Sequence, residues 1–90
     1  MAAARTPTSV IREGVGNLTL HIATFSDIDT GDTYVSGLTG IVGQWANATD
    51  TPTSATAGGI DVGESSGTFT FYPGEDSRTG KLFILTTQLN

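Results

Sequence analysis

The sequence predicts a small all-β protein: a compact antiparallel β-sandwich or β-barrel with an extended N-terminal arm. Sixteen Thr and twelve Gly among 90 residues favour strands and turns, because Thr suits a pleated surface and Gly supplies turn geometry. Residues 17–25 and 67–72 alternate between apolar and polar side chains, as half-buried strands do. Helix-forming residues are scarce, so a helical domain is not expected.

The length predicts a single domain, which we divide into an arm over residues 1–12 and a β domain over residues 13–90. A chain this short buries only about 60–65 % of the surface that its unfolded form exposes, so its stability margin is thin. Without cysteines, neither disulfides nor thiolate-bound metals reinforce it. Oligomerisation or docking onto a partner is the remaining natural reinforcement.

The net charge of −5 disfavours nucleic acid and anionic membrane surfaces as partners, because both attract basic proteins. No apolar run approaches the ~20 residues of a membrane-spanning helix. The start of the chain, Met1–Arg5, lacks the basic and apolar segments of a secretion signal. We therefore expect neither nucleic acid nor a membrane as partner, and the sequence gives no support for export.

In the first half, a turn over 13–16 is expected to precede the clearest amphipathic strand. Along residues 17–25, one face carries Leu18, Leu20 and Ile22, and the other carries Asn17, Thr19 and His21. This alternation predicts an exposed or interfacial imidazole for His21. Further strands are predicted over 33–35, 41–46 and 60–62, and a long loop over 47–57. The strand over 41–46 places Ile41, Gly43 and Trp45 on one side.

The most clearly patterned stretch is Gly67–Thr87. Phe69 and Phe71 share one face of an alternating strand, whereas Leu82–Leu85 is apolar on both faces. Such a two-sided run belongs either to a covered central strand or to a strand whose second face is buried by another chain. If the two strands pair across residues 73–80, they form a hairpin with an unusually long loop.

An acidic turn around Asp27, Asp29 and Asp32 superficially resembles a calcium-binding loop. A loop of the EF-hand type beginning at Asp27 requires Gly at its sixth position and Glu at its twelfth, which here are Asp32 and Leu38. An ordinary solvated turn is the favoured interpretation, with cation binding left open. We assign no metal site and no cofactor.

Catalytic groups are not apparent, and we predict that the protein is not an enzyme. His21 is the single residue that titrates near neutral pH, and it has no identifiable acid, base or nucleophile as partner. The carboxylates of Glu64, Glu75 and Asp76 are interpreted as solvating charges near turns. Trp45, Tyr34 and Tyr72 suit either carbohydrate stacking or burial in a core or subunit interface, and burial is favoured.

The C-terminal half resembles small virion proteins of tailed bacteriophages, in the style of capsid decoration (cement) proteins. The residues that carry the resemblance are Trp45–Asp50, Gly59–Val62, Gly67–Phe71, Pro73–Asp76 and Leu82–Leu85. The resemblance concerns size and style and includes no diagnostic motif, so no binding residues are transferred.

The resemblance implies a homotrimer on the outer surface of an icosahedral head, where it stabilises the shell at junctions between major capsid protein subunits. The small-residue arm suits a contact with the shell or with an adjacent copy. Two other functions remain open: another small virion component, such as a head–tail joining, tail or fibre protein, and a surface carbohydrate-binding module.

Overall fold

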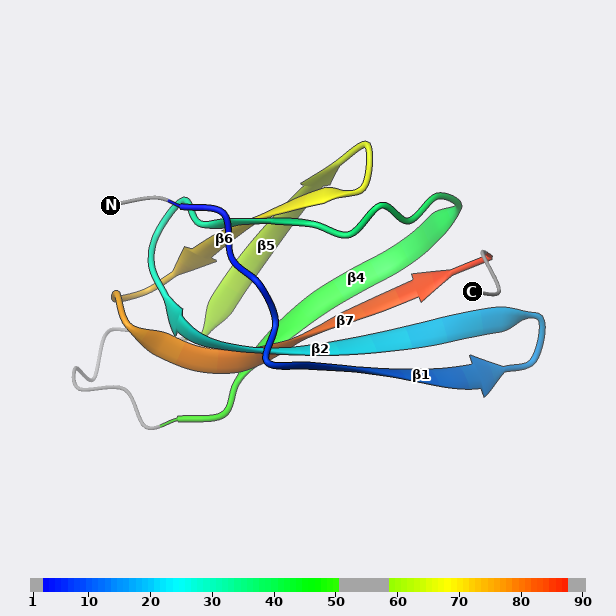
Figure 1. The fold of residues 1–90 in the computed structure, drawn as a ribbon, viewed down its shortest axis with the longest axis horizontal. Helices are drawn as coiled ribbons and strands as arrows, with labels where there is room; N and C mark the ends of the chain where they lie inside the picture. Colours follow the sequence, from blue (N-terminus) through cyan, green and yellow to red (C-terminus); the bar gives the residue numbers. More distant parts are fainter. Residues whose placement is uncertain (1–2, 51–58, 88–90) are drawn as a thin grey trace.

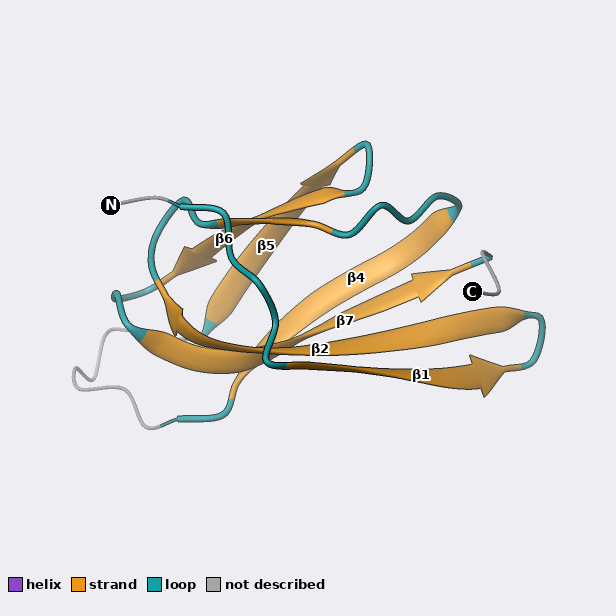
Figure 2. Ribbon diagram, in the orientation of Figure 1, coloured by secondary structure: helices purple, strands orange, loops and turns teal. Residues whose placement is uncertain are grey.

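Two antiparallel sheets make up the protein in a computed structural model that describes residues 3–50 and 59–87 (Figures 1 and 2). The larger sheet has the strand order β1-β2-β7-β4, and the smaller has the order β3-β6-β5. The strands are β1 (Ser9–Val15), β2 (Leu18–Ile28), β3 (Thr33–Val35), β4 (Ile41–Ala48), β5 (Ile60–Ser65), β6 (Thr68–Pro73) and β7 (Arg78–Thr86). The described residues include no helix, so the all-β prediction is confirmed.

Nothing in the described part of the chain is a helix long and apolar enough to cross a bilayer.

The core lies between the two sheets and is built around aromatic rings. Phe25 of β2 makes edge-to-face contacts with Tyr34 of β3 and Phe71 of β6, each with 5.1 Å between ring centroids. Phe69 and Phe71 are both fully buried, as their alternation predicts. From β7, Leu82 and Ile84 point into the same layer and are also fully buried.

The buried face of β2 is the opposite of the one that its hydrophobicity suggests. Thr19, His21, Ala23 and Phe25 point into the core, whereas the Leu and Ile residues of the strand point outward and are only half-buried. The expectation of an exposed His21 is therefore wrong. The strand alternates as predicted, but the alternation alone does not decide which of its two faces is the inner one.

The stretch around Gly67–Thr87 forms two strands that do not pair with each other. β6 pairs with β3 and β5 in the small sheet, and β7 pairs with β2 and β4 in the large one. The turn between them, residues 74–77, passes from one sheet to the other (Figure 1). The predicted hairpin is therefore wrong, and β7 instead holds the middle of the large sheet.

The N-terminal residues contact both sheets before β1 begins. Ala4 forms a parallel bridge with Thr33 of β3, and the backbone N–H of Thr8 donates to the carbonyl of Thr24 on β2. β1 starts at Ser9, so residues 9–12 of the predicted arm belong to the large sheet. β1 also extends through the predicted turn as far as Val15, and the chain reverses at Gly16, whose φ of +62° suits glycine.

The β4 strand is longer than expected. It runs through Ala48, so the first residues of the predicted 47–57 loop pair with β7. A register shift between Ile41 and Gly43 also separates Ile41 from the face that Gly43 and Trp45 share. Thr49 and Asp50 follow the strand as loop residues, and residues 51–57 of the predicted loop lie outside the described residues.

Candidate functional site

The outward-facing side of the large sheet, here called the outer face, is apolar across all four strands. Cross-strand pairing places Ile11, Ile22, Phe83 and Trp45 in one row, with one residue from each strand. A second row holds Glu13, Leu20, Leu85 and Gly43. The outer face comprises Ile11, Glu13, Val15, Leu18, Leu20, Ile22, Thr24, Gly43, Trp45, Asn47, Lys81, Phe83 and Leu85.

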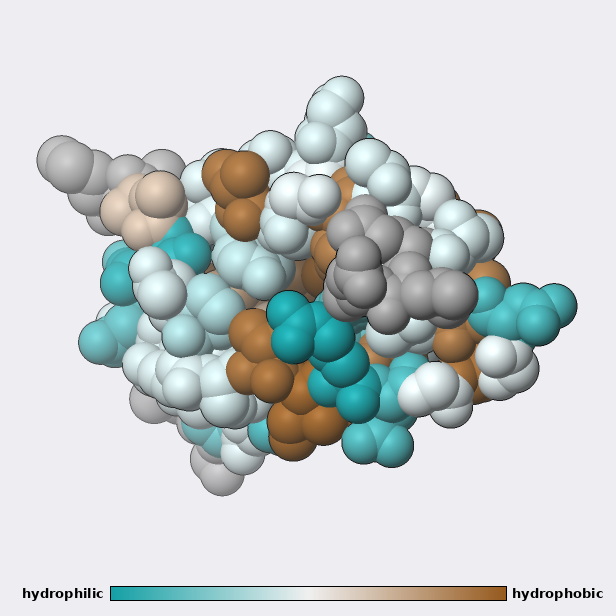
Figure 3. Space-filling view, turned by 45° about the vertical axis from the view of Figure 1, so that its right-hand side comes forward, coloured by the Kyte–Doolittle hydropathy of each residue, from teal (hydrophilic) through white to brown (hydrophobic). Residues whose placement is uncertain are grey.

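Trp45 and Phe83 form the aromatic part of this face. Their rings are stacked, with 5.2 Å between centroids and 5° between planes. The Trp45 side chain remains 44 % exposed. Its neighbour on the same face, Gly43, has no side chain to cover the indole. An exposed aromatic stack of this kind is typical of residues that bind a partner surface. On the side drawn in Figure 3, apolar side chains reach the surface in separate groups among polar ones.

The outer face carries one acidic and one basic side chain, Glu13 and Lys81. Lys81 Nζ lies 2.9 Å from the Thr24 hydroxyl oxygen, to which it donates a hydrogen bond at the polar end of the face. The chain has nine acidic residues, so eight of them lie elsewhere. The two charges on the outer face are of opposite sign, so this face has no net charge although the molecule is acidic.

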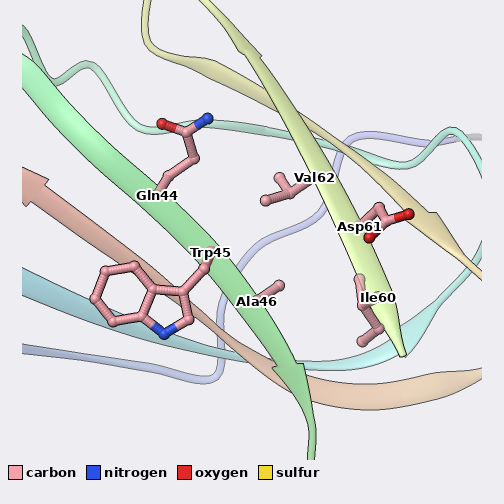
Figure 4. Close-up of a pocket in the computed structure, with 6 residues that line it drawn as sticks. All are labelled: Gln44, Trp45, Ala46, Ile60, Asp61 and Val62. Carbon is pink, nitrogen blue, oxygen red and sulfur yellow. The ribbon is translucent and has the colours of Figure 1, made fainter. Parts of the chain in front are cut away.

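A pocket of about 330 Å³ opens where β4 of the large sheet meets β5 of the small sheet (Figure 4). Ala46 and Gln44 line it from β4, and Ile60 and Val62 line it from β5. Figure 4 shows the Trp45 indole directed away from β5, so the stacked rings face the outer side of the sheet and do not fill the pocket. The pocket is a gap between two sheet edges and contains no cluster of reactive groups.

The acidic turn is a structural cluster that holds the N-terminal residues. Arg5 donates from Nε to Asp32 Oδ2 at 2.6 Å and from Nη2 to Asp29 Oδ2 at 3.4 Å. Asp32 is fully buried, and it also accepts hydrogen bonds from the backbone N–H groups of Ala3 and Asp29, both at 2.8 Å. The expectation of an ordinary solvated turn is therefore wrong at Asp32.

The environment keeps Asp32 ionised. Burial alone raises the pKa of a carboxyl group, but the hydrogen bonds from Asp29, Arg5 and Ala3 outweigh burial and hold the pKa of Asp32 below its usual value. Arg5 pairs with both Asp29 and Asp32, so these two carboxylates have a cationic partner within the protein. Among the described residues, no group of three or more His, Cys, Asp or Glu side chains is placed to hold a metal ion.

A second ion pair, between Arg78 and Asp50, was not predicted. Arg78 is 2 % exposed, and its Nε donates to Asp50 Oδ1 at 2.9 Å. Asp50 Oδ2 accepts from the backbone N–H of Thr79 at 3.0 Å. The Arg78 hydrogen bond is the main cause that lowers the pKa of Asp50. The partners lie 28 residues apart, so no local pattern signals the pair.

His21 is buried and has no catalytic partner among the described residues. Its Nε2 atom has no hydrogen-bond partner there, and its neighbours in the sheet are Arg12 and Ile84. Burial, and secondarily the positive charge of Arg12, lowers the pKa of His21. The imidazole is therefore neutral near pH 7, which suits a core side chain.

The other predicted candidate residues do not converge on one site. Glu64 accepts a hydrogen bond from the backbone N–H of Gly67 at one end of β6, and Asp76 accepts one from the N–H of Thr30 at the other end. Glu75 lies beside Asp76 in the turn that precedes β7.

The three candidate aromatic residues are also separated. Tyr34 packs in the core against Phe25 and lies 6.5 Å from Phe69 between ring centroids. Tyr72 is exposed on the small sheet, and Trp45 lies on the outer face of the large one. They form no common carbohydrate-stacking platform.

The strongest candidate for a functional site is thus the outer face, a surface suited to binding another protein. Comparisons of this chain with protein-family models, curated proteins and solved structures found no match.

Proposed function

We propose that the protein is a capsid decoration protein of a tailed bacteriophage, which binds as a homotrimer to the outer surface of the head. In this proposal it joins neighbouring major capsid protein subunits at their junctions and carries out no catalysis. The observation that carries the proposal is the apolar outer face of the large sheet. The resemblance of residues 41–87 to small virion proteins supplies the biological setting.

The distribution of charged groups favours a structural role. Asp29, Asp32 and Arg5 are engaged with one another, as are Asp50 and Arg78. These contacts tie distant parts of the chain together, which is the use expected in a protein whose task is mechanical support. The outer face, with the exposed side chains of Ile11, Val15 and Trp45, remains available for association.

The net charge of −5 is consistent with a position outside the capsid shell. An acidic protein is repelled by packaged DNA, so binding on the outer surface avoids competition with the genome for contacts. A small, cysteine-free β fold also gains stability by docking, because a partner supplies the burial that a 90-residue core lacks.

The proposal is tested with phage heads from which the protein has been left out. Purified protein is added, and its binding is measured by co-sedimentation and by the melting temperature of the heads. We expect saturable binding in a fixed ratio to the major capsid protein and a higher melting temperature. Heads already carrying the protein provide the control and should bind no more of it. Failure to bind the deficient heads would contradict the proposal.

Image reconstruction of the reconstituted particles separates decoration from the other virion functions. Density at the junctions of the shell supports decoration, whereas density confined to the portal vertex, tail or fibres identifies a different virion component.

A carbohydrate-binding module is the second candidate, favoured by the exposed Trp45 ring on the outer face. Titration with a glycan panel tests it, because a sugar stacked on the indole changes the fluorescence of the chain's single Trp. Tyr72→Ser serves as a control on the other sheet. A flat fluorescence response across the panel eliminates this function.

A further inference from the structure

The two lateral edges of the large sheet, β1 and β4, both carry exposed apolar side chains. Ile11 and Val15 on β1 are 50 % and 47 % exposed, and Trp45 and Val42 on β4 are 44 % and 58 % exposed. The apolar outer-face residues of the inner strands β2 and β7 are already half-buried. The most exposed apolar side chains of the large sheet therefore lie along its two edge strands. Edge strands also carry backbone N–H and C=O groups that no neighbouring strand pairs.

The two edge strands, β1 and β4, have the relative direction and the residue rows needed for antiparallel pairing between copies. Each strand of the large sheet is antiparallel to its neighbour, so β1 and β4 run in opposite directions. Ile11 and Trp45 occupy the same cross-strand row, and Glu13 and Gly43 occupy the next. Rotation about an axis along the strands keeps these levels, so the β1 edge of one copy meets the β4 edge of another with Ile11 beside Trp45.

Charge favours a second copy of this chain as the occupant. Each copy has a net charge of −5, so like charges oppose the association of two copies unless the surfaces that meet are close to neutral. The outer face avoids this repulsion, because it contains Glu13 as its single acid and Lys81 as its single base. It lets identical acidic subunits associate without neutralisation by another partner.

The width of the sheet fits a ring of three copies. If edge strands of neighbouring copies lie about 4.8 Å apart at each corner, four-stranded sheets stand about 7 Å from a threefold axis. That distance is close to the ~5 Å of side-chain depth between packed sheets, so Phe83 and Leu85 can fill the centre. A ring of four places the sheets about 11 Å from the axis and leaves a channel. A dimer with the two outer faces packed against each other leaves the backbone groups at the β1 and β4 edges unpaired.

We propose that the outer face forms the subunit interface of a three-membered ring, in which the β1 edge of each copy packs against the β4 edge of the next. The inference deepens the proposed function, which rests on the same outer face and on a homotrimer but does not say which surface joins the copies. The ring requires only copies of this chain, so it can be tested with the purified protein and without phage heads.

Cross-linking tests the contact directly, since the chain has no cysteine of its own. We expect the double variant Glu13→Cys/Gly43→Cys to oxidise to a covalent trimer on a non-reducing denaturing gel. Gly43 accepts a Cβ, which would meet no atom within 4 Å. Within one chain these positions are three strand spacings, about 14 Å, apart, too far for a disulfide. Each single variant should stay uncross-linked, as should the control pair Val35→Cys/Tyr72→Cys on the small sheet.

Sedimentation equilibrium tests the number of copies. We expect a mass of about 28 kDa, three times the 9.3 kDa of one chain. Trp45→Asp should give the mass of one chain, whereas Tyr72→Asp, at a similarly exposed aromatic of the small sheet, should not change the mass. Circular dichroism checks that each variant is folded, and Ile11→Asp replaces Trp45→Asp if the latter unfolds.

Several outcomes would overturn the inference: a monomeric or dimeric wild-type chain, a folded Trp45→Asp or Ile11→Asp variant that stays trimeric, or covalent trimers from a single-cysteine variant. Head binding of the same preparations separates this inference from the proposed function. A monomer that binds deficient heads contradicts the ring alone, whereas a cross-linked trimer that binds no heads contradicts the decoration function alone.

Discussion

Arg5 reaches across 27 residues of sequence to Asp32, with 2.6 Å between its Nε and the buried carboxylate oxygen Oδ2. The same carboxylate accepts the backbone N–H groups of Ala3 and Asp29. One side chain thus fixes both the N-terminal residues and the turn after β2. Without it, three donors lose a charged acceptor.

Asp32→Asn should lower the free energy of unfolding by about 1.5–3 kcal/mol, the range for hydrogen bonds to charged groups. Urea unfolding measures the change. Asp27→Asn is the matched control, because Asp27 is exposed and its φ of +55° is one that Asn tolerates. Equal effects of the two substitutions would mean that the Asp32 carboxylate contributes no more than a surface charge.

Stability should fall as the pH is lowered from 7 toward 5, because His21 is buried as the neutral imidazole. Its pKa is lowered in the folded state, so the unfolded chain binds the proton more readily. The stabilisation is complete above the ordinary pKa of about 6.5 and is lost as the pH falls below it, until the folded-state pKa is reached. Thermal unfolding in a pH series measures the slope.

His21→Gln is the control for this prediction, since it removes the titrating group from the same position. Its melting temperature should be nearly constant over the same pH range. A slope as steep as that of the wild type would assign the pH dependence to other groups.

Substitutions along β7 should separate core residues from outer-face residues. Leu82→Ala and Ile84→Ala should each cost about 2–5 kcal/mol, because both side chains are fully buried between the sheets. Phe83→Ala should cost less in an isolated subunit, since its ring remains partly exposed. Urea unfolding in an Ile11→Asp background, in which the subunits are expected to be separate, makes the comparison. A larger loss at Phe83 than at Leu82 would contradict the assignment of the two faces.

Gly80→Ala should destabilise the protein by about 1–3 kcal/mol through overpacking. A Cβ at this position would lie 2.5 Å from the backbone oxygen of Asn47 and 2.9 Å from Ile60 Cδ1. Gly14→Ala is the control, because its Cβ would meet no atom within 4 Å. Thermal unfolding of the pair measures the difference, and a neutral Gly80→Ala would show that β4 can move away from β7.

The elements predicted best are those whose pattern is local. The alternation of Phe69 and Phe71 identifies both the strand and its buried face, because the opposite face is polar. β2 is different, since Leu18, Leu20 and Ile22 alternate with Thr19 and His21 as a strand should, yet the more apolar face is the outer one. A period of two fixes which residues share a face, but only the tertiary structure decides which face is inside.

The pairing of strands and the buried ions could not be predicted, because both depend on residues far apart in sequence. The hairpin expected between β6 and β7 assumed that neighbours in the chain pair, whereas residues 74–77 cross between sheets. The Arg5–Asp32 and Arg78–Asp50 pairs likewise leave no mark on local composition. The two-sided apolar character of Leu82–Leu85, by contrast, is local, and the structure places this run on an inner strand of the large sheet with Leu82 and Ile84 buried and Phe83 and Leu85 half-buried.

The central position of β7 has a consequence for the order of events during synthesis. The ribosome produces β2 and β4 before β7, the strand that joins them, so each keeps an unpaired edge while residues 49–77 are added. The large sheet therefore cannot form strand by strand in the order of synthesis, and it is complete only after β7 has been added. A nascent chain that stalls before β7 exposes the apolar side chains of its earlier strands, and chaperone capture or rapid proteolysis of such intermediates is the expected fate in the cell.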